Sequence, residues 1–218
     1  MKDLGVIFDS ELNFVQHCKE KINTAYSYLG IIKRNLIYLD AFVMLYKSLV
    51  RSHLAYANSV WNPHRLGLIT DLEKVQMRVT KLVISITNFT YKDRLKRLKL
   101  PTLKYRRIRG NMIEVYTILT NKYDSRVNFY LEKQQDNITR GHSLKLVNNR
   151  YHYDLRKFSF APGIANVWNS LPEIVISAPT TDTFKRRLDK FWQHQDILYD
   201  YKVELTGVGN RSQINSIY

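Results

Sequence analysis

The chain has 218 residues, of which 44% are hydrophobic and 12% aromatic, and its formal net charge at pH 7 is +15. The apolar content excludes a chain that is disordered throughout. The single cysteine, Cys18, excludes a disulfide framework and a cysteine-rich zinc site, and no apolar run reaches the roughly 18 residues needed to span a bilayer. We therefore expect a nuclear or cytoplasmic protein with no membrane partner.

The first two predicted elements are a short strand and a long helix. Residues 4–8 are mostly apolar and partly β-branched, which predicts a strand, yet no partner strand precedes it. From this we expect the chain to begin in the middle of a larger domain. Residues 14–36 carry apolar side chains in steps of three and four, and this heptad-like seam includes Cys18. The pattern predicts that Cys18 is a core thiol.

The strongest helical pattern follows over residues 40–61. Asp40 is a good N-cap, and no helix-breaking residue occurs before Pro63. Two apolar stripes and a face of small residues predict a central helix that its partners cover on most sides. His53 lies on one apolar stripe and is predicted to be a core histidine instead of a catalyst.

Three more helices carry most of the excess charge. Capping boxes beginning at Thr70 and Thr90 predict two helix starts, and Pro101 precedes a third helix over residues 103–119. Residues 71–110 hold twelve Lys/Arg and three Asp/Glu, a net charge of +9. Such a concentration of positive charge favours a polyanionic partner, although a basic face with no ligand is the alternative.

The candidate nucleic-acid-binding residues come from these three helices. Lys and Arg dominate phosphate contacts, and the N-terminal end of a helix adds its own attraction for anions. The candidates are Lys74, Arg78 and Lys81 on one side of the first helix, Arg94 and Arg97 on the second, and Lys104, Arg106, Arg107 and Arg109 in the opening turns of the third.

The C-terminal part has a more mixed pattern. Residues 122–141 are polar and are predicted to form a connector. Residues 142–147 are predicted to form a strand, and residues 153–160 are its candidate partner strand. A short helix over residues 164–170 and a last helix capped by Thr181 or Asp182 follow. We predict a mainly α fold. A helical bundle spans residues 14–121, a small mixed α/β region spans 142–200, and a loose tail spans 201–218.

No complete catalytic or metal-binding pattern is present in the sequence. There is no acidic pair with metal-binding spacing, no HExxH motif and no CxxC pair. His142 and His152 flank strand-like segments without an obvious acidic or thiol partner. We therefore assign no catalytic residue, no metal ligand and no cofactor to this chain.

Taken in order, several stretches resemble the end of the reverse transcriptase of non-LTR (LINE-type) retrotransposons, especially the jockey-like clades. They are KDLGVIFDSELNF, LYKSLVRSHLAYANSVWNP, DLEKVQMRVTKLV, YKDRLKRLKLPTLKYRRIRGNMIEVYTIL, TRGHSLKL and ANVWNSLPEIVISAPTTDTFKRRLDKFW. The resemblance covers residues 2–192, and the series is more specific than any single piece.

The resemblance implies a division of roles along the chain. Residues 1–13, with Leu4 and Gly5, would be the remnant of the palm end, and the bundle would be thumb-like. The catalytic Asp-Asp motif of that family lies upstream and is absent here, together with the Mg²⁺ that its palm binds. The expected partners are an RNA/DNA template–primer and the missing fingers and palm. The resemblance thus implies a truncated, non-catalytic fragment that holds the template–primer in the intact enzyme. The alternatives are a stand-alone nucleic-acid-binding module and a non-functional helical relic.

Overall fold

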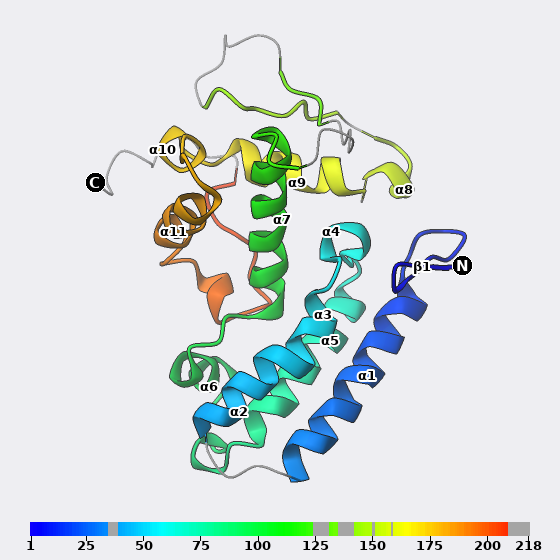
Figure 1. Cartoon of the computed structure of the whole chain (residues 1–218), viewed down its shortest axis with the longest axis vertical. Coiled ribbons are helices and arrows are strands. Elements are labelled where there is room, and N and C mark those ends of the chain that lie inside the picture. Colours follow the sequence, from blue (N-terminus) through cyan, green and yellow to red (C-terminus); the bar gives the residue numbers. More distant parts are fainter. Residues whose placement is uncertain (35–38, 124–130, 135–141, 150, 158, 209–218) are drawn as a thin grey trace. The chain divides into compact units, whose positions relative to one another are not determined.

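The computed structural model describes residues 1–34, 39–123, 131–134, 142–149, 151–157 and 159–208. The described residues are mainly helical, which confirms the predicted fold class (Figure 1). The chain forms two compact units. The first comprises Met1–Arg107 and Ile197–Val203, and the second comprises Ile108–Asp196 and Glu204–Tyr218. The division falls inside one long helix, α7 (Leu103–Leu119).

The chain begins with a two-stranded hairpin. Strand β1 (Lys2–Asp3) pairs antiparallel with β2 (Val6–Ile7), and Leu4 and Gly5 form the turn with φ angles of 42° and 79°. The expectation of an unpaired strand was therefore wrong, because the two residues just before the turn are its partner. Both central residues of this turn have positive φ, as in a type I′ hairpin turn, and Gly5 adopts such a φ freely whereas Leu4 does so only with strain.

The first long helix confirms its predicted seam. Helix α1 (Val15–Arg34) buries Cys18, Ala25, Leu29 and Ile32, which recur in steps of seven, four and three. The carboxylate of Asp9 accepts hydrogen bonds from the backbone N–H groups of Asn13 and Phe14 at 2.8 and 2.7 Å. These bonds satisfy two backbone donors just before the helix begins. The helix therefore starts close to residue 14 as expected.

The predicted single helix over residues 40–61 is interrupted, which corrects the sequence-based expectation. It consists of α2 (Leu39–Leu45), a π-helical turn η1 (Tyr46–Val50), α3 (Arg51–Ala55) and α4 (Asn58–Trp61). Ala57 has a left-handed φ of 52°. The break frees the carbonyl of Tyr56, which accepts the indole N–H of the buried Trp61 at 2.6 Å. The Tyr56 hydroxyl donates to the Leu4 carbonyl at 2.9 Å.

The next two helices begin differently from each other. Helix α5 (Leu66–Lys81) starts before Thr70, so the predicted capping box lies inside the helix and was wrong as a start signal. Its apolar stripe of Leu72, Val75 and Val79 is fully buried, and Leu82, just beyond the helix, is half-buried. After the 3₁₀ turn η2 (Ile84–Ile86), helix α6 (Tyr91–Leu98) confirms the second box, since the Thr90 hydroxyl accepts the Asp93 N–H at 3.3 Å.

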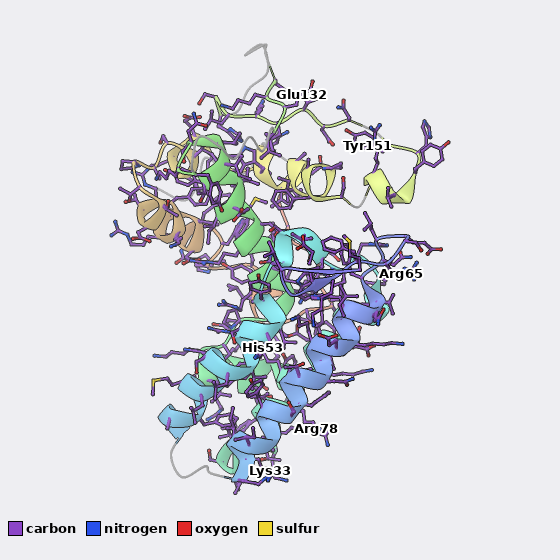
Figure 2. The ribbon with its side chains drawn as sticks, turned by 45° about the vertical axis from the view of Figure 1, so that its right-hand side comes forward. Lys33, His53, Arg65, Arg78, Glu132 and Tyr151 are labelled. Carbon is purple, nitrogen blue, oxygen red and sulfur yellow. The ribbon has the colours of Figure 1, made fainter. Side chains whose placement is uncertain are left out.

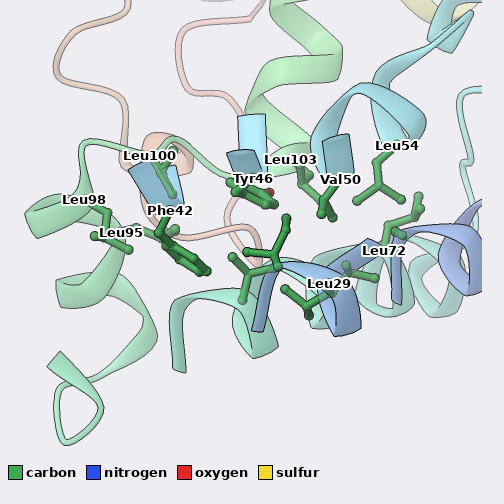
Figure 3. Packing of buried hydrophobic residues seen from close by; sticks show 14 of the residues in the cluster. Leu29, Phe42, Tyr46, Val50, Leu54, Leu72, Leu95, Leu98, Leu100 and Leu103 are labelled. Carbon is green, nitrogen blue, oxygen red and sulfur yellow. The ribbon is translucent and has the colours of Figure 1, made fainter. Parts of the chain in front are cut away.

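One hydrophobic core unites the helices of the first unit. Figure 3 shows side chains of α1, α2, η1, α5 and α6 meeting there, among them Leu29, Phe42, Tyr46, Leu72 and Leu95. The segment 197–203 belongs to the same unit. Its carbonyls at Ile197 and Leu198 accept the Thr102 hydroxyl at 2.6 Å and the Thr102 N–H at 2.8 Å. The first residues of the predicted loose tail are also anchored, since the Val203 carbonyl accepts the Lys104 ammonium at 3.1 Å and the Tyr201 ring lies 6.5 Å from that of Tyr91.

The second unit contains α8 (Asp154–Lys157), α9 (Phe160–Asn169), α10 (Glu173–Ile176) and α11 (Thr181–Phe191). The first unit resumes at Ile197, inside the 3₁₀ turn η3 (Asp196–Leu198). Tyr116 of α7 stacks on Phe184 of α11, with ring centroids 4.3 Å apart. The Thr180 side chain caps α11, whereas Thr181 or Asp182 was predicted, so the cap lies one or two residues earlier than expected. The resulting core joins α7, α9 and α11.

The two strands predicted in this unit are absent from its described residues. Residues 142–147 make only the isolated bridge between Lys133 and Leu146, and most of residues 153–160 are helical. Side chains of α9 make the backbone hydrogen bonds that a partner strand would otherwise make. The Trp168 indole N–H donates to the Leu144 carbonyl at 2.7 Å, and the Asn169 amide exchanges two hydrogen bonds with the Leu146 backbone at 2.9 and 2.8 Å. Most of the predicted connector, residues 124–130 and 135–141, lies outside the described residues.

Candidate nucleic-acid interface

The predicted basic stripe of α5 stands on the surface of the first unit. Lys74, Arg78 and Lys81 are all exposed, while the apolar stripe of the same helix is buried. Lys74 forms an ion pair with Asp71 at 2.8 Å, but both side chains are about half exposed. The ion pair is therefore weak, and a phosphate can easily replace Asp71 as the partner of Lys74. The three cations repeat at i, i+4 and i+7 and therefore project from one side of the helix.

An aromatic side chain supports this stripe from the neighbouring helix. The guanidinium carbon of Arg78 lies 5.4 Å from the ring centroid of Tyr26, which belongs to α1. Lys33 follows Tyr26 by seven residues, so it lies two turns along the same face of α1. Figure 2 shows Lys33 and Arg78 towards the same end of the unit. The exposed positive surface thus extends from α5 onto α1, a continuation that helical spacing alone did not reveal.

The two candidates of α6 have opposite environments. Arg94 is buried, donates to the Thr80 hydroxyl at 3.0 Å and to the Phe89 carbonyl at 2.6 Å, and its pKa is lowered by burial. It joins α6 to α5 and is not available to a phosphate, which corrects its assignment. Arg97 is exposed, with its guanidinium carbon 3.9 Å from the centroid of the Phe89 ring.

The beginning of α7 is occupied by protein groups. The Glu73 carboxylate accepts the Leu103 N–H at 3.3 and 3.1 Å, so it already fills the anion site at this helix N-terminus. Lys104 is buried and donates to the Val203 carbonyl at 3.1 Å. The predicted phosphate contact of Lys104 was therefore wrong, because its buried ammonium binds a backbone carbonyl of the same unit.

The remaining three arginines of α7 are also engaged or partly covered. Arg107 is 4% exposed, and burial lowers its pKa while the charge of Glu73 opposes that shift. Arg106 is half-buried. Arg109 makes a two-pronged ion pair with Asp189 of α11, at 2.5 and 2.7 Å. Of the nine candidates, the four exposed ones are Lys74, Arg78, Lys81 and Arg97.

A buried polar network explains why these α7 residues could not be recognised in the sequence. Tyr91 donates to Glu73 at 2.6 Å, and the Gln76 amide donates to the Tyr91 hydroxyl and the Pro101 carbonyl at 3.2 and 3.0 Å. Tyr46 donates to the Gln76 side-chain carbonyl. Burial raises the pKa of Glu73, and the nearby Arg107 charge partly offsets that rise. The attraction between Glu73 and Arg107 thus only partly offsets the burial of both charges, and the two terminal nitrogens of Arg107 are buried without a hydrogen-bond partner among the described residues.

Other candidate sites take no part in this surface. Cys18 is fully buried, and burial raises its pKa to about 11, so its thiol is unreactive at neutral pH. His53 is half-buried and stacks on Tyr28, with centroids 4.9 Å apart. His142 is buried against the Trp168 carbonyl at 3.1 Å, and His152 is exposed.

The described ranges hold neither a cluster of metal ligands nor a helix fit to cross a membrane. Among residues 1–34, 39–123 and the later described segments, no three His, Cys, Asp or Glu side chains gather as a metal site would require. In the same part of the chain, no helix combines the length and apolarity that crossing a bilayer demands.

Comparison with known proteins gives one distant relative. The chain is 27% identical over 128 residues to "Uncharacterized protein B0403.1" of Caenorhabditis elegans, an alignment that covers 56% of this chain and 65% of the relative. The match thus spans less than two thirds of that relative's length. No protein-family profile and no solved structure matches the chain.

Proposed function

We propose that the chain is a nucleic-acid-binding helical module that holds a template–primer duplex by its phosphates. In this proposal these residues correspond to the thumb and following region of a non-LTR retrotransposon reverse transcriptase. The ordered resemblance over residues 2–192 supports the family, and the exposed basic surface supports the binding role. These 218 residues hold no Asp-Asp motif, and the role proposed for them is binding.

The observation that carries the proposal is the exposure of the α5 stripe. Three cations on one helix face repel one another, and only Lys74 has an ion-pair partner among the described residues that flank it. Arg78 lies over Tyr26, which restricts the guanidinium while leaving it exposed. Such a surface binds the regularly spaced phosphates of a duplex without reading base sequence.

Salt dependence of binding tests this role quantitatively. We would titrate the chain into a fluorescein-labelled RNA–DNA hybrid duplex and follow anisotropy at a series of salt concentrations. Each neutralised phosphate contributes about 0.9 to the slope of log affinity against log salt on B-form DNA, and we take a similar value for the hybrid. The variant Lys74→Gln/Arg78→Gln/Lys81→Gln should therefore flatten the slope by roughly 2 to 3.

A matched control separates local contacts from net charge. Lys133→Gln/Arg186→Gln/Lys190→Gln removes the same charge from three exposed positions of the second unit. This control should keep the wild-type slope within about 1. If both triple variants flatten the slope equally, or if the folded α5 variant keeps it, the α5 stripe is not the binding surface.

A further inference from the structure

An open hollow of about 660 Å³ lies in the first unit, where α6 passes α2 and η1. Figure 1 shows α2 and α6 next to each other in this unit. The volume is in the range of sites that hold a drug-sized group. The lining residues are Val43, Met44, Lys47, Ser48, Arg97, Leu98 and Lys99.

The polar part of this hollow is entirely basic or neutral. Lys47 comes from η1, and Arg97 and Lys99 come from the end of α6. All three are exposed, and no Asp or Glu is among the lining residues. The hollow therefore attracts carboxylates or phosphates around its rim. Lys47 and Lys99 were not among the predicted binding residues, because neither belongs to a periodic basic stripe.

The apolar part of the hollow is aliphatic. Leu98 and Val43 are buried and half-buried, and Met44 is 66% exposed, a high value for such a side chain. Methionine adapts its shape to varied apolar partners. Nucleobases bind best on aromatic faces, but no described aromatic residue lines the hollow, and the ring of Phe89 is covered by Arg97 at 3.9 Å. The lining thus suits an aliphatic side chain better than a base.

The backbone around the hollow is unusual at two points. Lys47 and Ser48 lie in the π-helical turn, a feature that recurs at functional sites. Lys99 has φ +50° at the end of α6, a conformation that glycine would adopt with less strain. Retaining a lysine there sacrifices stability and places one more cation at the rim.

We propose that this hollow is the docking site for an acidic peptide segment of a partner protein. One aliphatic side chain of the segment lies against Met44, Val43 and Leu98, and its flanking carboxylates pair with Lys47, Arg97 and Lys99. This site goes beyond the nucleic-acid role and uses none of the α5 residues. The occupant follows from the charge of the rim together with the aliphatic lining.

Defined peptides test this assignment. The probe is fluorescein-labelled Asp-Glu-Leu-Leu-Asp-Glu, and its binding to the whole chain is followed by anisotropy. Lys47→Gln/Lys99→Gln should weaken binding at least about ten-fold, and Met44→Ser should weaken it several-fold, since each removes one recognised feature. The altered side chains are exposed, so folding should be retained, as circular dichroism would verify. Lys133→Gln/Lys190→Gln is the charge-matched control and should bind like the wild type.

Two further ligands decide between occupants. The peptide Asp-Glu-Ser-Ser-Asp-Glu should bind at least about ten-fold more weakly, because it lacks the aliphatic group. A single-stranded oligonucleotide should bind Lys47→Gln/Lys99→Gln nearly as well as the wild type. Equal affinity for the two peptides would refute the proposal, and so would the absence of peptide binding. The proposal would also be refuted if Lys47→Gln/Lys99→Gln weakened oligonucleotide binding more than peptide binding. None of these outcomes alters the α5 salt test, so the two proposals fail separately.

Discussion

The histidine at the start of α1 makes stability of the first unit depend on pH. His17 is fully buried, its Nδ1 accepts the Ile7 N–H at 3.2 Å, and its ring lies 4.9 Å from that of Trp61. Burial lowers the pKa of His17 to about 4, and the nearby positive charge of Lys21 adds to this effect. The imidazole is therefore neutral in the folded chain at neutral pH.

The lowered pKa of His17 means that the folded chain loses stability as the pH falls. An unfolded histidine takes up a proton near pH 6.5, whereas the folded one does so only near pH 4. Between these values the unfolded state binds more protons, so the free energy of unfolding falls by about 1.4 kcal/mol per pH unit as the pH is lowered. From pH 7 to pH 4 this amounts to about 3 kcal/mol, and above pH 6.5 it is fully retained.

The variant His17→Asn isolates this contribution, since its side-chain oxygen can accept the Ile7 N–H but does not titrate. Urea denaturation followed by circular dichroism at pH 7, 6, 5 and 4 would give the free energy of unfolding for both proteins. The wild type should lose about 3 kcal/mol more than the variant between pH 7 and pH 4. Parallel pH profiles would refute the assignment of a buried, neutral His17.

Substitutions at three further sites test the roles of the buried and capping residues. Glu73→Gln should destabilise the chain by roughly 1 to 3 kcal/mol in urea denaturation, because it removes the negative charge that partly offsets the burial of Arg107. Adding Arg107→Met should recover most of the loss, and no recovery would mean that the two charges do not interact. Arg94→Met should cost roughly 2 to 4 kcal/mol and leave the salt slope of duplex binding unchanged, whereas a flatter slope with normal stability would place Arg94 at the interface. Lys99→Gly should raise the free energy of unfolding by about 1 kcal/mol, while Lys96→Gly, inside the same helix, should lower it by a similar amount.

Local patterns in the sequence were sufficient where neighbouring residues decide the structure. The seam of α1 and the Thr90 cap of α6 depend on contacts a few residues apart, and both are confirmed. The exposure of Lys74, Arg78 and Lys81 was also predictable, because these side chains fall outside the apolar stripe of α5. Periodicity thus gave the fold class and the surface on which the proposed function depends.

Contacts between residues far apart in the sequence determine the features that local patterns did not predict. The break after α3 coincides with the bonding of Trp61 to Tyr56, and the start of α7 is filled by Glu73, thirty residues away in the chain. A run of arginines looks the same in sequence whether it faces water or a buried carboxylate. This is why Arg94, Lys104 and Arg107 were assigned to a surface that they do not reach.

Proximity cross-linking tests the central claim most directly. Cys18 is fully buried, so Lys81→Cys provides a single reactive thiol on the α5 stripe, and Arg186→Cys provides a matched thiol in the second unit. Each variant would be modified with azidophenacyl bromide, bound to a labelled RNA–DNA hybrid and irradiated. We predict that Lys81→Cys gives a strong cross-link to the duplex and Arg186→Cys gives little. Binding of the duplex without a cross-link from Lys81→Cys, or with equal yields from both positions, would contradict the account.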